Sequence, residues 1–567
     1  MGSVFRSVPA KMAAALLLAL PVVAMAAPLK GARANNTGRP MVGNPVTAHS
    51  VNVDLRNLPK AQEWRPGMPI REAHRRQYTP LGAKLPHAPE TKAVAPDRLP
   101  ELQQLFDQHT PNRLRAKSAG SRVSINNPNT GVSPGDPVVE VGTSHVVYAV
   151  NSGGSGTYFK VYDKAGALVA GPITFGSLAP AGNACTADRG DPLVYFDRQA
   201  GRWFFLTMDD GGVCTFVSKT SDPVSGGWWF YRYSTLAFPD YPHCGIWNDA
   251  YVCTTNEGSI AGADVYAFDR ANMLTGATAR PAQRFNSVPT LPGYGFQILT
   301  PSTFYGTTAA PAGRKQILAR HRDDEAHDGS SASATQDFIE LFEMNIDWNT
   351  PANSGITTLP RIAITEFNSW FRDYSTFATV PQPGSTSRLD PIREVILNQL
   401  TYRNFGTHES IVGTFATNQN TGRRRNSPVD SGVRWFELRR SGSGNWALHQ
   451  EGTFSPGDTN THHLIGVAAM DKFGNIGMGY NVTKTSSPTV YASLRYTGRT
   501  ASDPLGVMSL AETTVAAGAA VEGSGRWGDY YQMTVDPVDD CTFWFVGMYR
   551  PSGSWQTRIQ DFKFPGC

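Results

Sequence analysis

A loosely repeated pattern of strand beginnings constrains the fold of this chain more than any other feature. Gly135-Asp136-Pro137-Val138-Val139 resembles Gly190-Asp191-Pro192-Leu193-Val194, and comparable beginnings follow at Asp240, Gly295, Tyr402, Thr461 and Arg526. Successive beginnings lie about 50–65 residues apart, with one interval of about 106, and such a period is typical of large-bladed β-propellers. Seven beginnings predict seven blades.

Local patterns and composition support an all-β fold. Short runs that alternate apolar and polar residues, such as His145–Val150, Gly201–Met208 and Thr542–Tyr549, are strand signals. Gly (55) and Pro (40) supply many turns, while aromatic residues reach 11% and charged residues only 17%. We therefore predict a single β-propeller over residues 121–567. Six or eight blades, or two packed β-sandwich domains, are the alternatives.

The long interval has a visible cause in two segments that interrupt the pattern. Arg322–Gln336 is a polar loop, and Trp370–Asn398 is an irregular excursion that leads into a short helix expected near Asp390–Leu400. Arg423–Arg425 is interpreted as a solvated loop.

The N-terminal part of the chain differs from the rest. Arg6 and Lys11, the uncharged run Met12–Met25 and the small-x-small motif Ala24-Met25-Ala26 predict a signal peptide over residues 1–26. Residues 27–120 are rich in Pro and basic residues, and we interpret them as a pro-segment or an arm that wraps the main domain, with a disordered linker as the alternative. Within them, Leu99–His109 has a helical period, with Leu102, Leu105 and Phe106 on one side.

Export and charge limit the partners. The signal peptide predicts a secreted protein, extracellular or periplasmic, and no later segment reaches the ~18 apolar residues of a membrane span. The net charge of +4 is small for 567 residues, so neither nucleic acid nor a membrane surface is expected as a partner. We expect a monomer.

The six cysteines are expected to form three disulfides, because an even number in an exported chain favours bridges. Proximity in the sequence favours three pairs, Cys185–Cys214, Cys244–Cys253 and Cys541–Cys567. A cysteine metal site is the alternative, but no C-x-x-C spacing supports it.

Polar residues gather at the predicted strand beginnings, which converge on the central channel of a propeller. This set is the default candidate site, and it comprises Asp136, Arg189, Asp191, Asp240, His243, Arg403, His408, Glu409, His462, His463, Arg526, Asp529 and Tyr530. Asp136 and Asp191 are equally explained as turn residues of Gly-Asp-Pro. Asp136 and Asp529 are candidates for a Ca²⁺ site, since carboxylates are its usual ligands; no other cofactor is expected.

Arg403, His408 and Glu409 form the sharpest cluster within this set. Paired carboxylates, or a Tyr activated by a Glu, can cleave a glycosidic bond. A His and Tyr pair with an Arg that neutralises a uronate could instead abstract a proton and eliminate. Arg189, Arg403, Arg526 and His243 are the candidates for substrate binding.

Four segments resemble secreted bacterial β-propellers of the sialidase-like, BNR-repeat type. They are RGDPLVYFDRQAGRWFF, DYPHCGIWNDAYVCTTNE, YRNFGTHESIV and RWGDYYQMTVDPVDDCTFWF, and the resemblance covers roughly residues 125–567. It implies an arginine triad, a Tyr–Glu nucleophile and an Asp acid/base, for which Arg189, Arg403, Arg526, Tyr530, Glu409 and Asp191 are the candidates. The Asp-box is not matched, because the nearest string, SGGSGTYF at Ser152, lacks the Asp.

The sequence therefore predicts a secreted propeller that acts on extracellular polysaccharide or glycoconjugate. Its activity would be that of a glycoside hydrolase or a polysaccharide lyase at the channel mouth, with Glu409, His408, Tyr530 and Asp191 as catalytic residues. The alternative is a non-catalytic, carbohydrate-binding or adhesive propeller.

Overall fold

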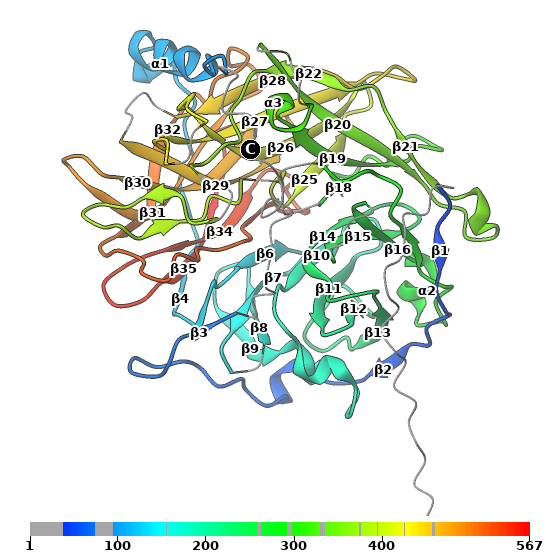
Figure 1. Ribbon diagram of the computed structural model, residues 1–567. Coiled ribbons are helices and arrows are strands. Elements are labelled where there is room, and N and C mark those ends of the chain that lie inside the picture. Colours follow the sequence, from blue (N-terminus) through cyan, green and yellow to red (C-terminus); the bar gives the residue numbers. More distant parts are fainter. Residues whose placement is uncertain are drawn as a thin grey trace, which may run out of the picture. The chain divides into compact units, whose positions relative to one another are not determined.

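The chain is a β-propeller built from consecutive antiparallel sheets (Figure 1). The structure, a computed structural model, describes residues 38–73, 94–154, 156–257, 262–291, 298–328, 333, 335–372, 376–393, 395–423, 426–455 and 460–567. All of them fall within one structural unit, Ala34–Cys567. The predicted signal peptide and Gly295 lie outside the described residues.

The first three sheets follow one another without interruption. Each is a meander of four strands, to which the N-terminal segment adds a fifth in the second and third sheets. The meander strands are β6 (Val138–Val141), β7 (His145–Ser152), β8 (Gly156–Asp163) and β9 (Leu168–Thr174); β10 (Leu193–Asp197), β11 (Arg202–Asp209), β12 (Gly212–Ser218) and β13 (Trp228–Ser234); and β14 (Asp240–Ile246), β15 (Tyr251–Asn256), β16 (Asp264–Phe268) and β17 (Gln283–Phe285).

The next two meanders are joined by parallel pairing of β18 with β25, and β22 adds to the edge of β20. Their strands are β18 (Thr300–Tyr305), β19 (Gln316–Arg322), β20 (Gln336–Asn345), β21 (Gly355–Thr358) and β22 (Ile362–Thr365), followed by β25 (Leu400–Asn404), β26 (Glu409–Asn418), β27 (Ser431–Arg440) and β28 (Ala447–Phe454). Between the two meanders lies a small hairpin of β23 (Val380–Pro381) and β24 (Arg388–Leu389).

The last two sheets complete the ring. They contain β29 (Thr461–Met470), β30 (Ile476–Lys484), β31 (Val490–Arg499) and β32 (Leu510–Gly518), and then β33 (Gln532–Val535), β34 (Phe543–Tyr549), β35 (Gln556–Phe562) and β4 (Ser124–Asn127). The N-terminal strand β4 is thus the outermost strand of the C-terminal sheet. Each first strand contacts the first strand of the next sheet, in the order β6, β10, β14, β18, β25, β29, β33 and back to β6.

We interpret the seven meanders among the described strands as seven blades. The seven first strands surround the central axis, and the parallel register of β18 and β25 shows that neighbouring first strands run in the same direction. The residues that precede these strands therefore lie at one end of the propeller, which we call the entry face. The residues that follow them lie at the opposite end, the exit face.

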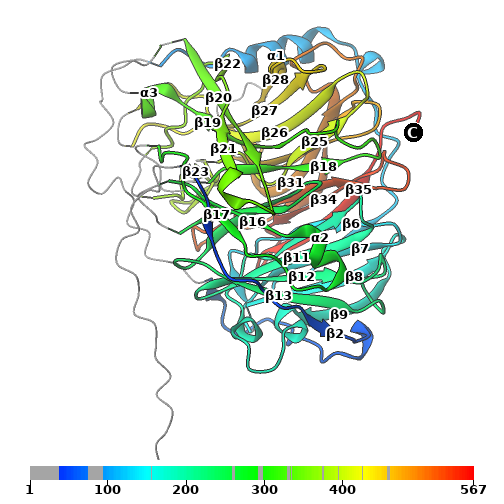
Figure 2. The ribbon, with the colours of Figure 1, turned by 90° about the vertical axis from the view of Figure 1, so that its right-hand side faces the viewer.

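Residues before the propeller are tied to its outer edges. β1 (Met41–Val42) pairs with β17, β2 (His49–Val51) pairs with β13, and β3 (Arg71–Glu72) pairs with β5 (Val132–Ser133). Figure 2 shows β2 beside β13 and α1 (Leu99–His109) against β28, in agreement with the pairings and contacts. Two further short helices are α2 (Arg270–Thr275) and α3 (Asp324–His327).

Helix α1 confirms the predicted span but not the predicted buried side. Leu102 and Leu105 are exposed, whereas Gln103 is buried and its side chain bonds the N–H and the carbonyl of Met508. Polar pairing rather than an apolar stripe therefore fixes this helix. Among the residues described, no helix has the length and apolar composition that crossing a membrane requires.

All three predicted disulfides are present, Cys185–Cys214, Cys244–Cys253 and Cys541–Cys567. Aromatic side chains fill the space between adjacent sheets, as in the stacked pair Phe204 and Tyr251, whose ring centroids are 4.3 Å apart. Two local predictions are wrong. The described residues of Asp390–Leu400 form turns and irregular backbone instead of a helix, and Arg423 is buried instead of solvated.

Candidate functional site

Five carboxylates from separate parts of the chain meet at the entry face. We call Asp136, Asp191, Asp240, Asp390 and Asp529 the central carboxylate cluster. Asp136 and Asp191 lie two residues before β6 and β10, Asp240 begins β14, and Asp529 lies three residues before β33. Asp390 comes from the excursion, directly after β24. The first strands of the propeller therefore bring together residues almost 400 positions apart in sequence (Asp136 and Asp529 are separated by 393 residues).

The backbone conformation before these first strands determines where the carboxylates point. Asp136, Asp191 and Tyr241 have φ values of 51°, 54° and 51°, in the left-handed region that Asp tolerates better than most residues. Asp136 and Asp191 thus adopt a left-handed backbone conformation in irregular segments just before β6 and β10. The same geometry also directs their carboxylates into one cluster.

Backbone and amide donors hold the cluster together. The backbone N–H of Asp529 donates to Asp136 Oδ1 at 2.6 Å, and Asn151 Nδ2 donates to Asp136 Oδ2 at 2.7 Å. Asn151 Oδ1 in turn accepts from the backbone N–H of Asp191 at 2.8 Å. One buried asparagine therefore links the beginnings of the first two blades.

The two carboxylate oxygens of Asp529 lie in different surroundings. Its Oδ2 accepts from Arg526 Nη2 at 2.8 Å, whereas its Oδ1 is buried and has no hydrogen-bond partner among the described residues. The pKa of the Arg526 guanidinium is raised, because Asp529, Asp136, Asp390 and Asp191 outweigh the opposing effect of burial. Arg526 thus offsets one charge in a cluster of five acids.

Three rings line the cluster. Tyr530 Oη lies 3.2 Å from Asp191 Oδ2 and 3.1 Å from the carbonyl oxygen of Pro242. The rings of Tyr241 and His243 pack at 4.7 Å, and those of Tyr241 and Tyr530 at 4.8 Å. Burial lowers the pKa of His243 to about 3, so its imidazole is neutral.

The environment raises the pKa of three carboxyl groups of the cluster. Burial, followed by the charges of Asp240 and Asp529, raises the pKa of Asp191 to about 8. Burial and Asp529 raise the pKa of Asp390 to about 7, and burial with Asp529 and Asp191 raises that of Asp136 well above its usual value. Like charges that share a buried site produce this pattern. Asp191 and Asp240 are only partly buried, so this edge of the cluster reaches solvent.

Arg403, His408 and Glu409 lie elsewhere, on the exit face. The predicted fifth beginning, Tyr402, falls inside β25, which starts at Leu400, so the three residues follow the strand rather than precede it. Arg403 pairs with Asp540, beyond the end of β33, whereas Tyr530 precedes that strand. Six extended residues from Tyr530 to Asp536 span roughly 20 Å. The structure therefore separates the two groups that sequence analysis placed at one mouth.

Glu409 is already engaged where it lies. Its oxygens accept from Arg314 Nε at 2.7 Å, from Arg314 Nη2 at 2.5 Å and from Tyr402 Oη at 2.8 Å. His408 stacks on Phe405 with ring centroids 4.9 Å apart. The hairpin lines a cavity of about 340 Å³, which Glu409 borders with both oxygens bonded. A structural ion pair explains Glu409 better than a catalytic role.

The three arginines implied by the sialidase-like resemblance do not form a triad. Arg189 pairs with Asp210 on the surface, Arg403 with Asp540 at the exit face and Arg526 with Asp529 in the cluster. Each guanidinium is bound to a different aspartate, so they do not converge on one anionic group.

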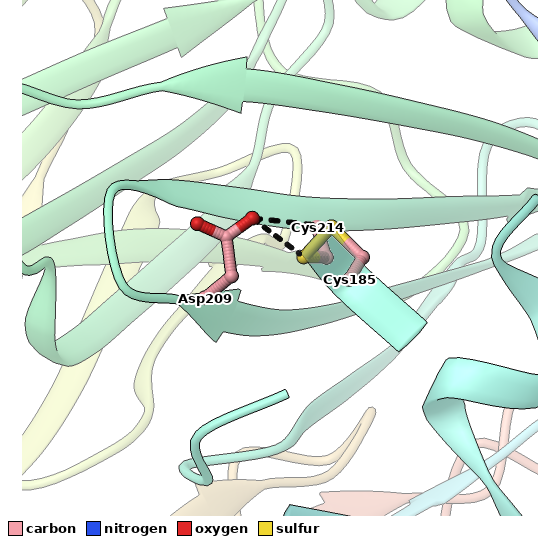
Figure 3. Close-up of side chains that lie close together, drawn as sticks. All are labelled: Cys185, Asp209 and Cys214. Atoms are coloured by element: carbon pink, nitrogen blue, oxygen red, sulfur yellow. Dashed lines mark hydrogen bonds between the residues drawn. A yellow bond between two sulfur atoms is a disulfide. The ribbon is translucent and has the colours of Figure 1, made fainter. Parts of the chain in front are cut away.

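The structure brings the two candidate metal ligands, Asp136 and Asp529, together, but with no third ligand atom close to both among the described residues. Both Asp136 oxygens accept N–H donors, and neither Asp136 nor Asp529 belongs to any set of three mutually close ligand atoms found in the described part of the chain. One such set is the Cys185–Cys214 disulfide with Asp209, in which Oδ2 lies 3.6 Å from Cys185 Sγ (Figure 3). Because bonded sulfurs carry no thiolate, and Arg232 pairs with Asp209 at 2.5 Å, this set is structural.

Asp390 is a site residue that the sequence did not predict. It follows no repeated strand beginning and falls in the excursion, where a helix was expected. Its contribution becomes visible only when the chain between β22 and β25 folds back over the entry face, and no local pattern in the sequence signals this.

Comparisons with known proteins find solved structures of low similarity and no matching family. No protein-family model and no curated protein matches the sequence. Solved structures that are similar include the endo-arabinase from Bacteroides thetaiotaomicron VPI-5482 (TM-score 0.26, 9% identity, 65% of this chain and 92% of that chain) and a protein of unknown function from Dyadobacter fermentans DSM 18053 (0.32, 10%, 78% and 99%). Another is the WD40 domain of SCAP from fission yeast (0.31, 9%, 77% and 97%). At these values we take no activity, substrate or family membership from them.

Proposed function

We propose that this protein is a secreted glycoside hydrolase whose active site is the central carboxylate cluster. The supporting observation is the contrast within the cluster: Asp191 holds a proton near neutral pH, while Asp529 is paired with Arg526. Glycoside hydrolysis needs such a pair, with one carboxylic acid to protonate the leaving oxygen and one carboxylate to act as base or nucleophile.

Asp191 is proposed as the general acid. When protonated, it can donate to Tyr530 Oη, while the Tyr530 hydroxyl donates to the carbonyl of Pro242, which satisfies both polar groups. Tyr530 is therefore a positioning residue that orients the acid until a glycosidic oxygen replaces it as the acceptor. The partial exposure of Asp191 gives substrate a route to this proton.

Asp529 is proposed as the base or nucleophile. Arg526 donates to its Oδ2, and Oδ1 is left as an acceptor with no partner in the described part of the chain. An oxygen of this kind can accept a proton from water or attack an anomeric carbon.

The charge of the site favours a neutral polysaccharide as substrate. The cluster contains five carboxyl groups, and Arg526, the guanidinium that pairs with one of them, is engaged by Asp529. The carboxylate of a sialic acid or uronate would have to compete with Asp529 for Arg526, which makes an acidic sugar a poor fit to this site. We therefore propose an extracellular glycan of uncharged sugars, and the sialidase-like and lyase interpretations become less favoured.

The test measures turnover on a panel of neutral and acidic glycans. Reducing-end release reports hydrolysis, and ultraviolet absorbance of unsaturated products reports elimination. Asp191→Asn and Asp529→Asn should each lower the hydrolysis of a neutral glycan by about 10²–10⁴-fold. The control Asp163→Asn should keep full activity, because Asp163 lies in the β8–β9 turn at the exit face, where it accepts backbone N–H groups that an asparagine oxygen can also bind.

The outcomes separate the alternatives. Binding of a glycan without release of any product would support the carbohydrate-binding propeller. Unsaturated products from an acidic glycan would support a lyase. Activity that survives in both cluster variants would exclude the proposed site.

A further inference from the structure

A second group of buried carboxylates, made of residues other than those of the proposed active site, lies at the entry face of the fourth blade. We call Asp323, Glu325, Asp337 and Glu366 the α3 carboxylate cluster. Asp323 caps α3, Glu325 lies within it, Asp337 is in β20, and Glu366 follows β22. Each of these residues is at most 5% exposed.

The geometry of this cluster fits a cation. Carboxylate oxygens of Asp323, Glu325 and Asp337 all lie within 4.8 Å of one another. Oxygens that share a calcium ion at 2.3–2.6 Å fall within such a span.

Two of the side chains lack an N–H or hydroxyl donor in the described part of the chain. The oxygens of Glu325 and Glu366 are buried and accept no such bond there, while the two carboxyl groups lie within hydrogen-bonding reach of each other and Glu325 also faces Arg423. Asp323 and Asp337, in contrast, accept N–H bonds from the backbone of Ser369 and Phe367 at 2.8 Å. Buried acceptors without donors are costly, and a bound ion is one of the standard explanations.

Among the described residues, one guanidinium forms ion pairs with the cluster. Arg423 Nη2 lies 2.7 Å from Asp323 and 3.7 Å from Glu325 Oε2. Arg423 thus pairs with two of the four carboxylates, and Arg434 acts on Asp337 through its charge. Buried charges must be paired, coordinated to a metal or neutralised by protons.

From these observations we propose that the α3 carboxylate cluster binds one Ca²⁺. The mutually close ligand atoms are all oxygens, which favours hard cations such as Ca²⁺ or Mg²⁺ over Zn²⁺. Ca²⁺ accepts irregular sets of mono- and bidentate carboxylates, whereas Mg²⁺ requires near-octahedral geometry and retains water. The ion would join α3, β20 and the segment after β22, and through Arg423 it would brace the loop between β26 and β27.

Metal analysis of the purified full-length protein tests the site. After dialysis against calcium-containing and then metal-free buffer, we expect one Ca²⁺ per chain, removable with a chelator and restored by titration with CaCl₂. The doubly substituted Glu325→Gln/Glu366→Gln protein keeps the shape of both side chains and should lose the ion. In the control, Glu343→Gln, the substitution is in the same strand as Asp337 but at its far end, and calcium content should not change.

Thermal unfolding and terbium luminescence complete the test. Ca²⁺ should raise the Tm of the native protein and of Glu343→Gln but not that of the double variant. If the double variant does not fold, Tb³⁺ bound to the native protein gives a second measurement: Trp370, next to Ser369, should sensitise its emission, and Trp370→Phe should reduce that emission. Absence of any bound divalent ion, an equal Tm with chelator and with Ca²⁺, or selective binding of Zn²⁺ would overturn the proposal.

Discussion

Asp97 provides a sharp test of how the N-terminal segment is held to the propeller. Its Oδ2 lies 2.8 Å from Arg434 Nη2 and accepts from Thr453 Oγ1 at 2.7 Å, and the side chains of Asp97 and Arg434 are 1% and 0% exposed. Arg434 also pairs with Glu451 at 3.0 Å. Asp97→Ala therefore leaves a fully buried guanidinium with one carboxylate instead of two.

Breaking a buried ion pair from one side costs about 3–5 kcal/mol. Because Glu451 remains, we expect the low end, about 3 kcal/mol of unfolding free energy. Urea unfolding followed by tryptophan fluorescence measures this as a lower midpoint with an unchanged slope. The matched control is Asp107→Ala in α1, whose partner Arg115 is partly exposed, and its expected cost is below about 1 kcal/mol. Equal midpoints for the two variants would refute the reasoning.

Three further predictions concern the exit face, the core and the central cluster. Glu409→Gln should lower the free energy of unfolding by about 1–3 kcal/mol, because Arg314 loses its charged partner, and should leave the rate of hydrolysis unchanged. Loss of turnover in a variant that folds normally would show that Glu409 belongs to the active site after all. Gly142→Ala should destabilise the protein by about 1–3 kcal/mol in urea, since the new Cβ would meet the Trp203 ring at 2.5 Å, and an unchanged midpoint would contradict this packing. Because the pKa of Asp191 is raised on folding, this group contributes stability that is fully present below pH 3.8 and is lost as the pH rises toward about 8. The Tm of the native protein should therefore fall across this pH range, and Asp191→Asn should make the fall smaller. Parallel curves of Tm against pH for the two proteins would disprove this prediction.

The fold could be predicted from the sequence because each blade repeats the same local signals. Gly-Asp-Pro before an apolar run gave the correct first strand at β6 and β10, and Cys541–Cys567 and the other bridges followed from proximity. The pairing of β1 and β2 with the outer edges of two blades has no comparable signal, because two or three residues of edge strand carry no periodicity.

The site was predictable only in part, because the beginning of one first strand was placed at the wrong residue. Asp136, Asp191 and Asp529 meet because they precede first strands of known position. At the fifth blade the visible pattern began at Tyr402, inside the strand, so Arg403, His408 and Glu409 were assigned to the wrong end. Asp390 and Arg423 act through folded-back loops, whose position depends on tertiary contacts rather than on local sequence.

The pH dependence of kcat/KM on a neutral glycan tests the central claim most directly. If Asp191 is the general acid, the alkaline limb of the profile should fall about tenfold per pH unit above about pH 8, since its deprotonation removes the acid. Asp191→Asn should abolish this limb together with most of the activity. A native rate that stays constant well above pH 8, or a variant that keeps the native profile, would contradict the proposed role of the central carboxylate cluster.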